Sequence, residues 1–340
     1  MGQSSVDTTL APTVELFGFT HESLIRQLGD FFNKLTHYLI KEVDVDLLEC
    51  ITFAINTEHY LNKISTLDNR YSQSNDAGVG TAKTVSKIKD DWGRNHIVVN
   101  CEFLGLEHLL NEYQDRTTEE DIARVVGMVS HLLFHEMCHV SHNKILLNRY
   151  PDLLTKEIFE NEFKAAKHVI TLACWDEFYV CSRANQFGAD QEENYKTILL
   201  NTMNTFNNSR DSIFKEYKYE SLVGNPKAYS NLFNKFMNLV YTLFKYCSYY
   251  LGDLISKENS ELDNEVLNHE LSDVVKTLTV ILHDLYRHFE NETLAEEDFH
   301  KIGEFAAVFA RLNGLIVEEG DYDGLFINLD KQTQLRMMLV

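Results

Sequence analysis

The chain has 340 residues, 44% of them hydrophobic, and a formal net charge of −21. These values predict a folded globular protein with one large domain or two smaller ones. The negative charge argues against nucleic acid as a partner, because the phosphate backbone would be repelled. Since the chain contains only 3 prolines and 15 glycines, we expect long helices and few turns.

The cysteines and the hydropathy pattern bear on the cellular compartment. The 6 cysteines form no CxxC pair and no spacing typical of a disulfide framework, so we expect reduced side chains in a cytoplasmic protein. No apolar run is long enough to span a bilayer, and the N-terminus lacks a signal-peptide pattern. We therefore expect no membrane partner.

The N-terminal segment is predicted to contain a frayed stretch, a helix and a strand. Residues 1–13 are polar, and apolar side chains then recur at helical spacing from about Thr20 to Lys41. Residues 46–56 have the alternation of a strand. A short helix is expected to follow, around Ile64.

A hairpin is predicted after a polar loop at residues 71–80. Residues 81–89 and 96–101 have strand patterns, and residues 90–93 have the composition of a turn. The second strand has two interpretations. It is either a sheet edge, to which a peptide substrate adds as an extra strand, or an ordinary core strand.

A long buried helix is predicted between Thr117 and Tyr150. Thr117 and Glu120 fit a capping box, and the acidic residues around them favour the positive end of the helix dipole. Apolar residues beyond this cap lie almost all around the helix, which is typical of a buried one. Pro151 is expected to end the helix, and Thr155 to cap the next.

The sequence His-Glu-x-x-His occurs inside this helix as His135, Glu136 and His139. Residues four apart lie one above the other on a helix, so both imidazoles face the same way and can take two corners of a zinc tetrahedron. Glu136 can then act as general base on a water. The alternative is a set of core histidines satisfied by carbonyls and carboxylates. Burial of these polar groups favours the metal, because it supplies the partners that they need.

A third protein ligand is needed, because two histidines do not hold zinc tightly. His142 stands where the metzincin pattern has glycine, and pairing His131 with His135 would leave Glu136 without its role. The acidic residues of the following helix remain, namely Glu157, Glu160, Glu162, Asp176 and Glu177. Glu177 is the best candidate, because a carboxylate among aromatic residues is buried at a cost unless it coordinates something.

His135, Glu136 and His139 followed by Glu177 resemble the gluzincins, the thermolysin-like zinc metallopeptidases. The resemblance implies that the two histidines and Glu177 bind Zn²⁺ and that Glu136 activates the water. One position departs from the family: Cys181 stands where an aspartate often orients a histidine ligand. The oxyanion-stabilising group is left open among Tyr179, Tyr246, Tyr249, Tyr250 and His288.

The sequence thus predicts an α+β, predominantly α-helical protein with a zincin-like core. The predicted parts are an N-terminal helical segment (1–45), a catalytic core (46–190) with a small sheet, and a helical C-terminal region (191–340) packed on that core. The predicted function is a zinc metallopeptidase that hydrolyses a peptide or protein substrate. The alternative is a zinc-binding regulatory or partner-binding protein with little or no turnover. The oligomeric state is left open.

Overall fold

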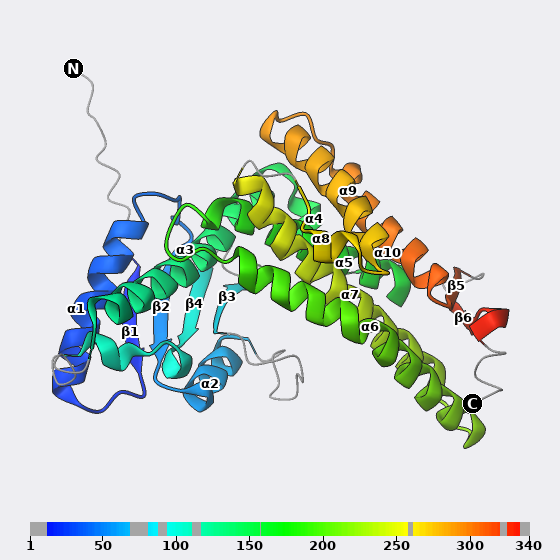
Figure 1. The fold of residues 1–340 in the computed structure, drawn as a ribbon, viewed down its shortest axis with the longest axis horizontal. Coiled ribbons are helices and arrows are strands. Elements are labelled where there is room, and N and C mark those ends of the chain that lie inside the picture. The colour runs from blue at the N-terminus through cyan, green and yellow to red at the C-terminus, as the bar shows by residue number, and fades with distance from the viewer. Residues whose placement is uncertain are drawn as a thin grey trace. The chain divides into compact units, whose positions relative to one another are not determined.

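The chain forms two compact units, Met1–Pro151 with Arg183–Asp190 and Asp152–Ser182 with Gln191–Val340. A computed structural model describes residues 12–68, 81–87, 94–110, 117–156, 158–257, 261–319 and 325–333 (Figure 1). The predicted fold class is confirmed: the protein is α+β, predominantly helical, with a small mixed sheet and a long helical C-terminal region. The three predicted functional segments stay a prediction, because compactness does not test them.

The first unit is built on a four-stranded mixed sheet with the order β1-β2-β4-β3. The first three strands in this order are parallel, and β3 pairs antiparallel with β4. The strands are β1 (Thr13–Phe17), β2 (Leu48–Ala54), β3 (Ala82–Lys87) and β4 (Arg94–Asn100). The predicted strand at 46–56 and both hairpin strands are thereby confirmed, whereas the predicted loop at 71–80 and the turn at 90–93 lie outside the described residues.

One expectation about the sheet needs correction, and one choice between two interpretations is decided. Residues 1–13 were expected to be frayed, yet β1 begins at Thr13 and pairs in parallel with β2; residues 1–11 lie outside the description. The second hairpin strand is not an edge, because β4 lies between β2 and β3. Within the described ranges the edge on that side is β3.

Helices cover both faces of this sheet. On one face α2 (Thr57–Leu67) packs a small core of Ala54, Tyr60, Ile64, Val85 and Val98. On the opposite face lies α1 (Glu22–Leu39), from which Phe32 stacks on Phe53 at 3.6 Å between ring centroids. On that same face the long helix α3 (Glu119–Arg149) is joined to β3 by a hydrogen bond that Thr84 donates to Glu136 O and by one that Ser86 accepts from Asn143. Two short 3₁₀ helices, η1 (Cys101–Phe103) and η2 (Leu106–Leu109), precede α3.

The long helix α3 confirms the predicted buried helix, with its cap one residue later than expected. The capping box joins Thr118 to Asp121, not Thr117 to Glu120. The helix ends at Arg149, and Pro151 follows at the start of α4 (Pro151–Thr155). Buried side chains lie along its length, so the packing of α3 fixes the direction in which its polar groups point.

The described residues of the second unit are helical apart from one antiparallel pair of strands. Its longer helices are α5 (Glu162–Ala184), α6 (Glu192–Leu222), α7 (Ala228–Ser256), α9 (Ser272–Glu290) and α10 (His300–Leu312). Short elements are α8 (Asn264–Leu267), η4 (Glu296–Phe299) and the antiparallel pair β5 (Leu315–Glu319) and β6 (Leu325–Leu329). The helix that carries Glu177 begins later than predicted: Asn161 accepts a hydrogen bond from Lys164 N at 2.9 Å and caps α5, whereas Thr155 closes α4.

All 6 cysteines are free, and Cys50 alone among them is not buried. Among the described residues, no helix combines the length and the apolar character that crossing a bilayer requires.

Candidate metal centre

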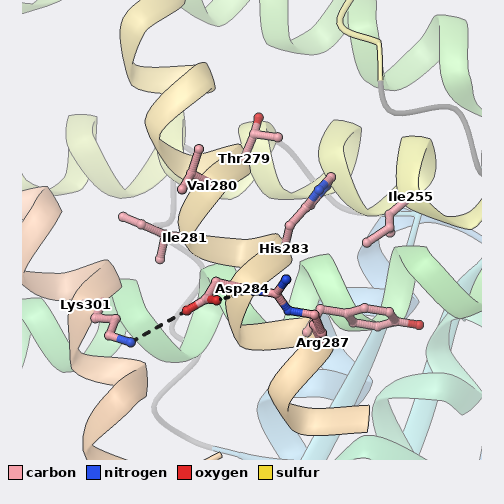
Figure 2. Close-up of a pocket in the computed structure, with 9 residues that line it drawn as sticks. Ile255, Thr279, Val280, Ile281, His283, Asp284, Arg287 and Lys301 are labelled. Atoms are coloured by element: carbon pink, nitrogen blue, oxygen red, sulfur yellow. Dashed lines mark hydrogen bonds and ion pairs between the residues drawn. The ribbon is translucent and has the colours of Figure 1, made fainter. Parts of the chain in front are cut away.

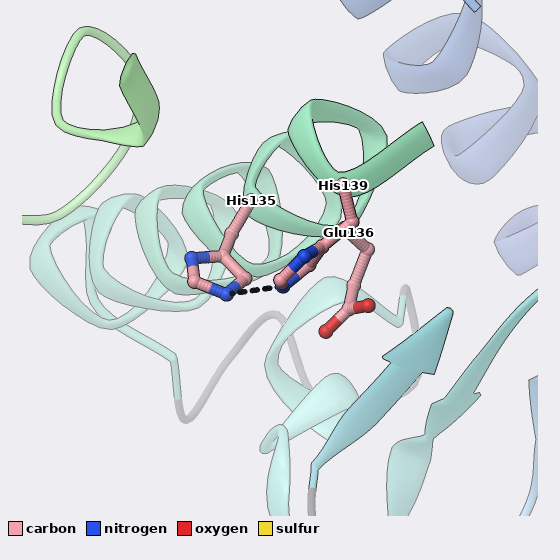
Figure 3. A group of neighbouring side chains, drawn as sticks. All are labelled: His135, Glu136 and His139. Carbon is pink, nitrogen blue, oxygen red and sulfur yellow. Dashed lines mark hydrogen bonds between the residues drawn. The ribbon is translucent and has the colours of Figure 1, made fainter. Parts of the chain in front are cut away.

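The His-Glu-x-x-His residues form a compact polar group in the middle of α3. His135, Glu136 and His139 each offer one ligand atom, and these atoms lie within 4.8 Å of one another (Figure 3). The two imidazole rings approach edge to face, with their Nε2 atoms 3.2 Å apart. His135 and Glu136 are buried. The group therefore has the composition and the spacing of a metal-binding site.

The separation of the two imidazole nitrogens fits a tetrahedral metal ion. Zinc binds histidine nitrogen at about 2.0–2.1 Å, so two corners of a tetrahedron are about 3.3–3.4 Å apart. The 3.2 Å between His135 Nε2 and His139 Nε2 is close to that value. Two imidazoles that face each other through Nε2 are otherwise satisfied only when one ring donates its proton to the other. The donor set thus fits a metal ion, and its geometry does not identify which metal.

Glu136 is held by the neighbouring strand β3. Thr84 Oγ1 lies 2.7 Å from Glu136 Oε2 and 3.1 Å from the backbone oxygen of the same residue. The threonine hydroxyl donates in both contacts, and its single proton serves one oxygen at a time. No local sequence pattern indicates this partner, because Thr84 occurs in an ordinary strand pattern and contacts α3 only in the folded chain.

His131, one turn before His135, has a structural environment. Its Nδ1 lies 3.3 Å from the backbone oxygen of Phe187, in the segment after α5 that belongs to the same unit. Burial, together with the neighbouring His135, lowers the pKa of His131 to about 4. The close approach needs Gly188, since a Cβ there would meet His131 N at 2.5 Å. His131 is thus a neutral, buried side chain outside the ligand group.

Glu177 lies in the second unit, and its role as third ligand stays a prediction. Its Oε1 accepts a hydrogen bond from Tyr249 at 2.9 Å and pairs with Lys245 Nζ at 3.0 Å, both from α7. Burial is the largest influence and lowers the pKa of the Lys245 ammonium, but the Glu177 carboxylate together with Tyr241 and Tyr246 raises that pKa overall. Burial and the same carboxylate raise the pKa of the Tyr249 phenol. The carboxylate of Glu177 is thus buried in contact with an ammonium and a phenol.

The other residues considered as third ligand differ in burial and in the unit to which they belong. Glu160 and Glu162 are exposed, and Asp176 lies in α5 of the second unit. His142 is buried in α3 but does not belong to the group of His135, Glu136 and His139. Glu157 lies outside the described residues.

The residues considered for oxyanion stabilisation all belong to the second unit. Tyr249 contacts Glu177 and stacks on Tyr246, and the Tyr250 oxygen accepts a hydrogen bond from Asp263 N at 3.1 Å. The ring of Tyr179 packs on aromatic neighbours, and His288 pairs with Thr293. Their assignment to catalysis stays a prediction. Cys181, where the family often has aspartate, is fully buried.

A pocket of about 720 Å³ also lies in the second unit, mainly along α9 (Figure 2). Aliphatic side chains such as Val280 and Ile281 share its wall with charged groups. Asp284 accepts a hydrogen bond from Arg287 at 2.7 Å and faces Lys301 Nζ at 3.8 Å. Because the charges at this pocket are paired internally, it presents no ready site for an ion.

A scan against models of protein families gives no match, and neither do searches of curated proteins and of solved structures. The buried His-Glu-His group on α3, which has the spacing of a metal-binding site, is therefore the basis for any functional conclusion.

Proposed function

We propose that this protein is a zinc-dependent peptidase whose metal is held by His135, His139 and Glu177. The observation that carries the proposal is the 3.2 Å separation of the two Nε2 atoms, with the Glu136 carboxylate within 4.8 Å of them. Glu177 enters on the sequence resemblance alone. The substrate is a peptide or protein, and the free cysteines favour a reducing, cytoplasmic compartment.

Each residue has a distinct role in the proposed hydrolysis. His135 and His139 bind the metal as neutral imidazoles, and their backbones are fixed by the buried helix. When bound, the metal supplies Lewis-acid chemistry, polarising the scissile carbonyl and making a water more acidic. Glu136 takes the proton of the attacking water and passes it to the leaving amine. Thr84 holds the carboxylate that does so.

A zinc-binding regulatory or partner-binding protein is the second candidate. The contacts of Glu177 favour it, because the Lys245 ammonium already compensates this carboxylate without any metal. Cys181 in place of the family's aspartate supports it as well. An intact Glu136 supports the peptidase, since a site that only binds metal needs no general base.

The decisive first experiment is the metal content of the purified protein and three variants, His139→Ala, Glu177→Ala and Glu162→Ala. We expect about one zinc per chain in the wild type and loss of zinc in the first two variants. Glu162→Ala is the control, because it removes an exposed carboxylate from the same helix as Glu177. Wild-type protein that stays free of zinc after reconstitution would refute the metal centre. Zinc retained in Glu177→Ala would refute only the assignment of Glu177 as third ligand.

Turnover then separates the two candidate functions. Glu136→Gln should bind zinc as the wild type does and lose nearly all hydrolysis of a peptide library, because the amide cannot accept the proton. Loaded wild-type protein that cleaves no peptide would favour the binding protein. Full activity in Glu136→Gln would exclude Glu136 as the base.

A further inference from the structure

The contact between Thr84 and Glu136 constrains a carboxylate that lies very near the two imidazoles. Thr84 faces Ile97 of β4 in the strand register, and its hydroxyl reaches across to α3. The Glu136 carboxylate lies on the same side of α3 as His135 and His139 (Figure 3). Its ligand oxygen is within 4.8 Å of both ring nitrogens. The Glu136 carboxylate would therefore lie near any metal ion that the two imidazoles hold.

Carboxylate oxygen is an ordinary zinc ligand, with a bond of about 2.0–2.2 Å. A glutamate whose oxygen coordinates the metal is held by the cation instead of against the attacking water, and so no longer serves as general base. The same residue can thus act as base or as ligand, and its position decides between the two.

We propose that Thr84 is a positioning residue that keeps Glu136 out of the ligand set. The proposal rests on the proposed metal centre and adds a residue that determines whether Glu136 acts there as base or as ligand. The hydroxyl donates to Oε2 at 2.7 Å and so fixes the carboxylate beside β3. Without this donor, Glu136 turns to the metal and coordinates it. The protein then binds zinc more tightly and loses its base.

The same strand offers a matched control. Ser86 also projects from β3 towards α3, where Asn143 Nδ2 donates to its oxygen at 2.9 Å and Ser86 in turn donates to Asn95. Asn143 lies one helical turn beyond His139. Ser86→Ala therefore breaks a hydrogen bond between β3 and α3 without touching Glu136. A general loosening of the strand would appear in both variants, whereas a specific effect appears only at Thr84.

The test measures zinc affinity by chelator competition and records the visible absorption of the cobalt-loaded protein. Thr84→Val keeps the shape of the side chain and removes the donor. We expect zinc affinity to rise on the order of tenfold, a change equal in size but opposite in sign to the loss that follows when a group that orients a metal ligand is removed. The cobalt spectrum should change, because a ligand is added. Thr84→Ser should restore the wild-type affinity and spectrum, and Ser86→Ala should leave both as they are.

The double variant Thr84→Val/Glu136→Ala separates an effect that acts through Glu136 from a general structural effect of the Thr84 substitution. Its zinc affinity should equal that of Glu136→Ala alone, because the extra ligand is gone. Glu136→Ala alone should have the zinc affinity of the wild type. This expectation can be tested even when Thr84→Val does not fold.

Each failure has a separate meaning. Unchanged affinity and spectrum in Thr84→Val, tightening that persists without Glu136, or weakened zinc binding in Glu136→Ala each overturn the proposal for Thr84. Wild-type protein that binds neither zinc nor cobalt overturns the metal centre itself, and the role of Thr84 with it.

Discussion

Each unit contains a long helix with a buried glutamate, and the two glutamates have different hydrogen-bond and charge partners. Glu136 of α3 is 6% exposed and meets a neutral hydroxyl, that of Thr84. Glu177 of α5 is 7% exposed and meets an ammonium and a phenol, those of Lys245 and Tyr249. A buried carboxylate is costly unless it is paired, so the charge of Glu177 is compensated within its own unit. The carboxylate of Glu136 instead accepts a hydrogen bond from Thr84, a neutral donor that brings no opposite charge.

The comparison shows what each carboxylate is suited to do. A base must be able to take up a proton, and a neutral donor orients it without an ion pair that opposes protonation. A carboxylate paired with an ammonium stays ionised, which suits a metal ligand or a structural ion pair equally well. The predictions below test this difference, starting with the largest expected effect.

Removing the ammonium should be the most damaging change. Lys245→Met leaves the buried Glu177 carboxylate without its opposite charge. Because the Lys245 side chain is 28% exposed, the loss of unfolding free energy should not exceed the lower end of the range for buried pairs, about 3 kcal/mol. Urea denaturation measures it. Lys167→Met is the control, because its partner Glu304 is largely exposed and such pairs contribute about 0–1 kcal/mol. The double variant Lys245→Met/Glu177→Gln should recover part of the loss; equal losses in both single lysine variants would contradict a compensated Glu177.

Zinc should stabilise the chain in a way that separates the two glutamates. At a free zinc concentration of 100 times the dissociation constant, binding to the folded state alone adds about 2.7 kcal/mol. Glu136→Gln should keep this gain, since that residue is the base. Glu177→Gln should lose most of it if Glu177 is a ligand. Denaturant curves with and without zinc check this, and an undiminished gain in Glu177→Gln would leave that residue as a structural ion pair.

The phenol should matter less than the ammonium. Tyr249→Phe removes one hydrogen bond to the ionised Glu177 while the ring can keep its stack on Tyr195, at 5.3 Å between centroids. Hydrogen bonds to charged groups contribute about 1.5–3 kcal/mol, so we expect a loss near 2 kcal/mol. Tyr246→Phe, which removes a neighbouring phenol and leaves both contacts to Glu177, should have a smaller effect. A loss in Tyr246→Phe as large as in Tyr249→Phe would assign the cost to packing.

The sequence predicts the parts of this molecule that depend on local patterns. The helical character of α3, the two hairpin strands and the His135-Glu136-His139 group all follow from residue spacing. The strand β1 does not, because its five residues are defined by parallel pairing with β2, on the far side of a helix in the chain. Contacts made through tertiary structure, such as Thr84 with Glu136, have no local signature either.

The starts of α3 and α5 are predicted only approximately from the sequence, because several possible capping residues occur close together before each helix. The sequence favours Thr117 for α3 and Thr155 for the helix of Glu177, whereas the structure uses Thr118 and Asn161. Thr118→Ala and Asn161→Ala should each lower the unfolding free energy by about 1 kcal/mol, the usual worth of an N-cap. Thr117→Ala and Thr155→Ala should lower it less; thermal denaturation of the four variants decides which residues cap.

The cap of α3 should also respond to acid, and this is the smallest effect. Hydrogen bonds from the Thr118 side chain and backbone lower the pKa of Asp121. A carboxyl whose pKa is depressed on folding adds stability above its unfolded pKa of about 3.9, and that stability is lost as the pH falls through the folded value. The difference between wild type and Thr118→Ala should therefore narrow as the pH falls below about 4. Asn161 carries no charge, so the loss of unfolding free energy in Asn161→Ala should not follow the titration of a capping carboxyl. If the losses in Thr118→Ala and Asn161→Ala both became smaller in parallel as the pH fell, the cause would be general acid unfolding.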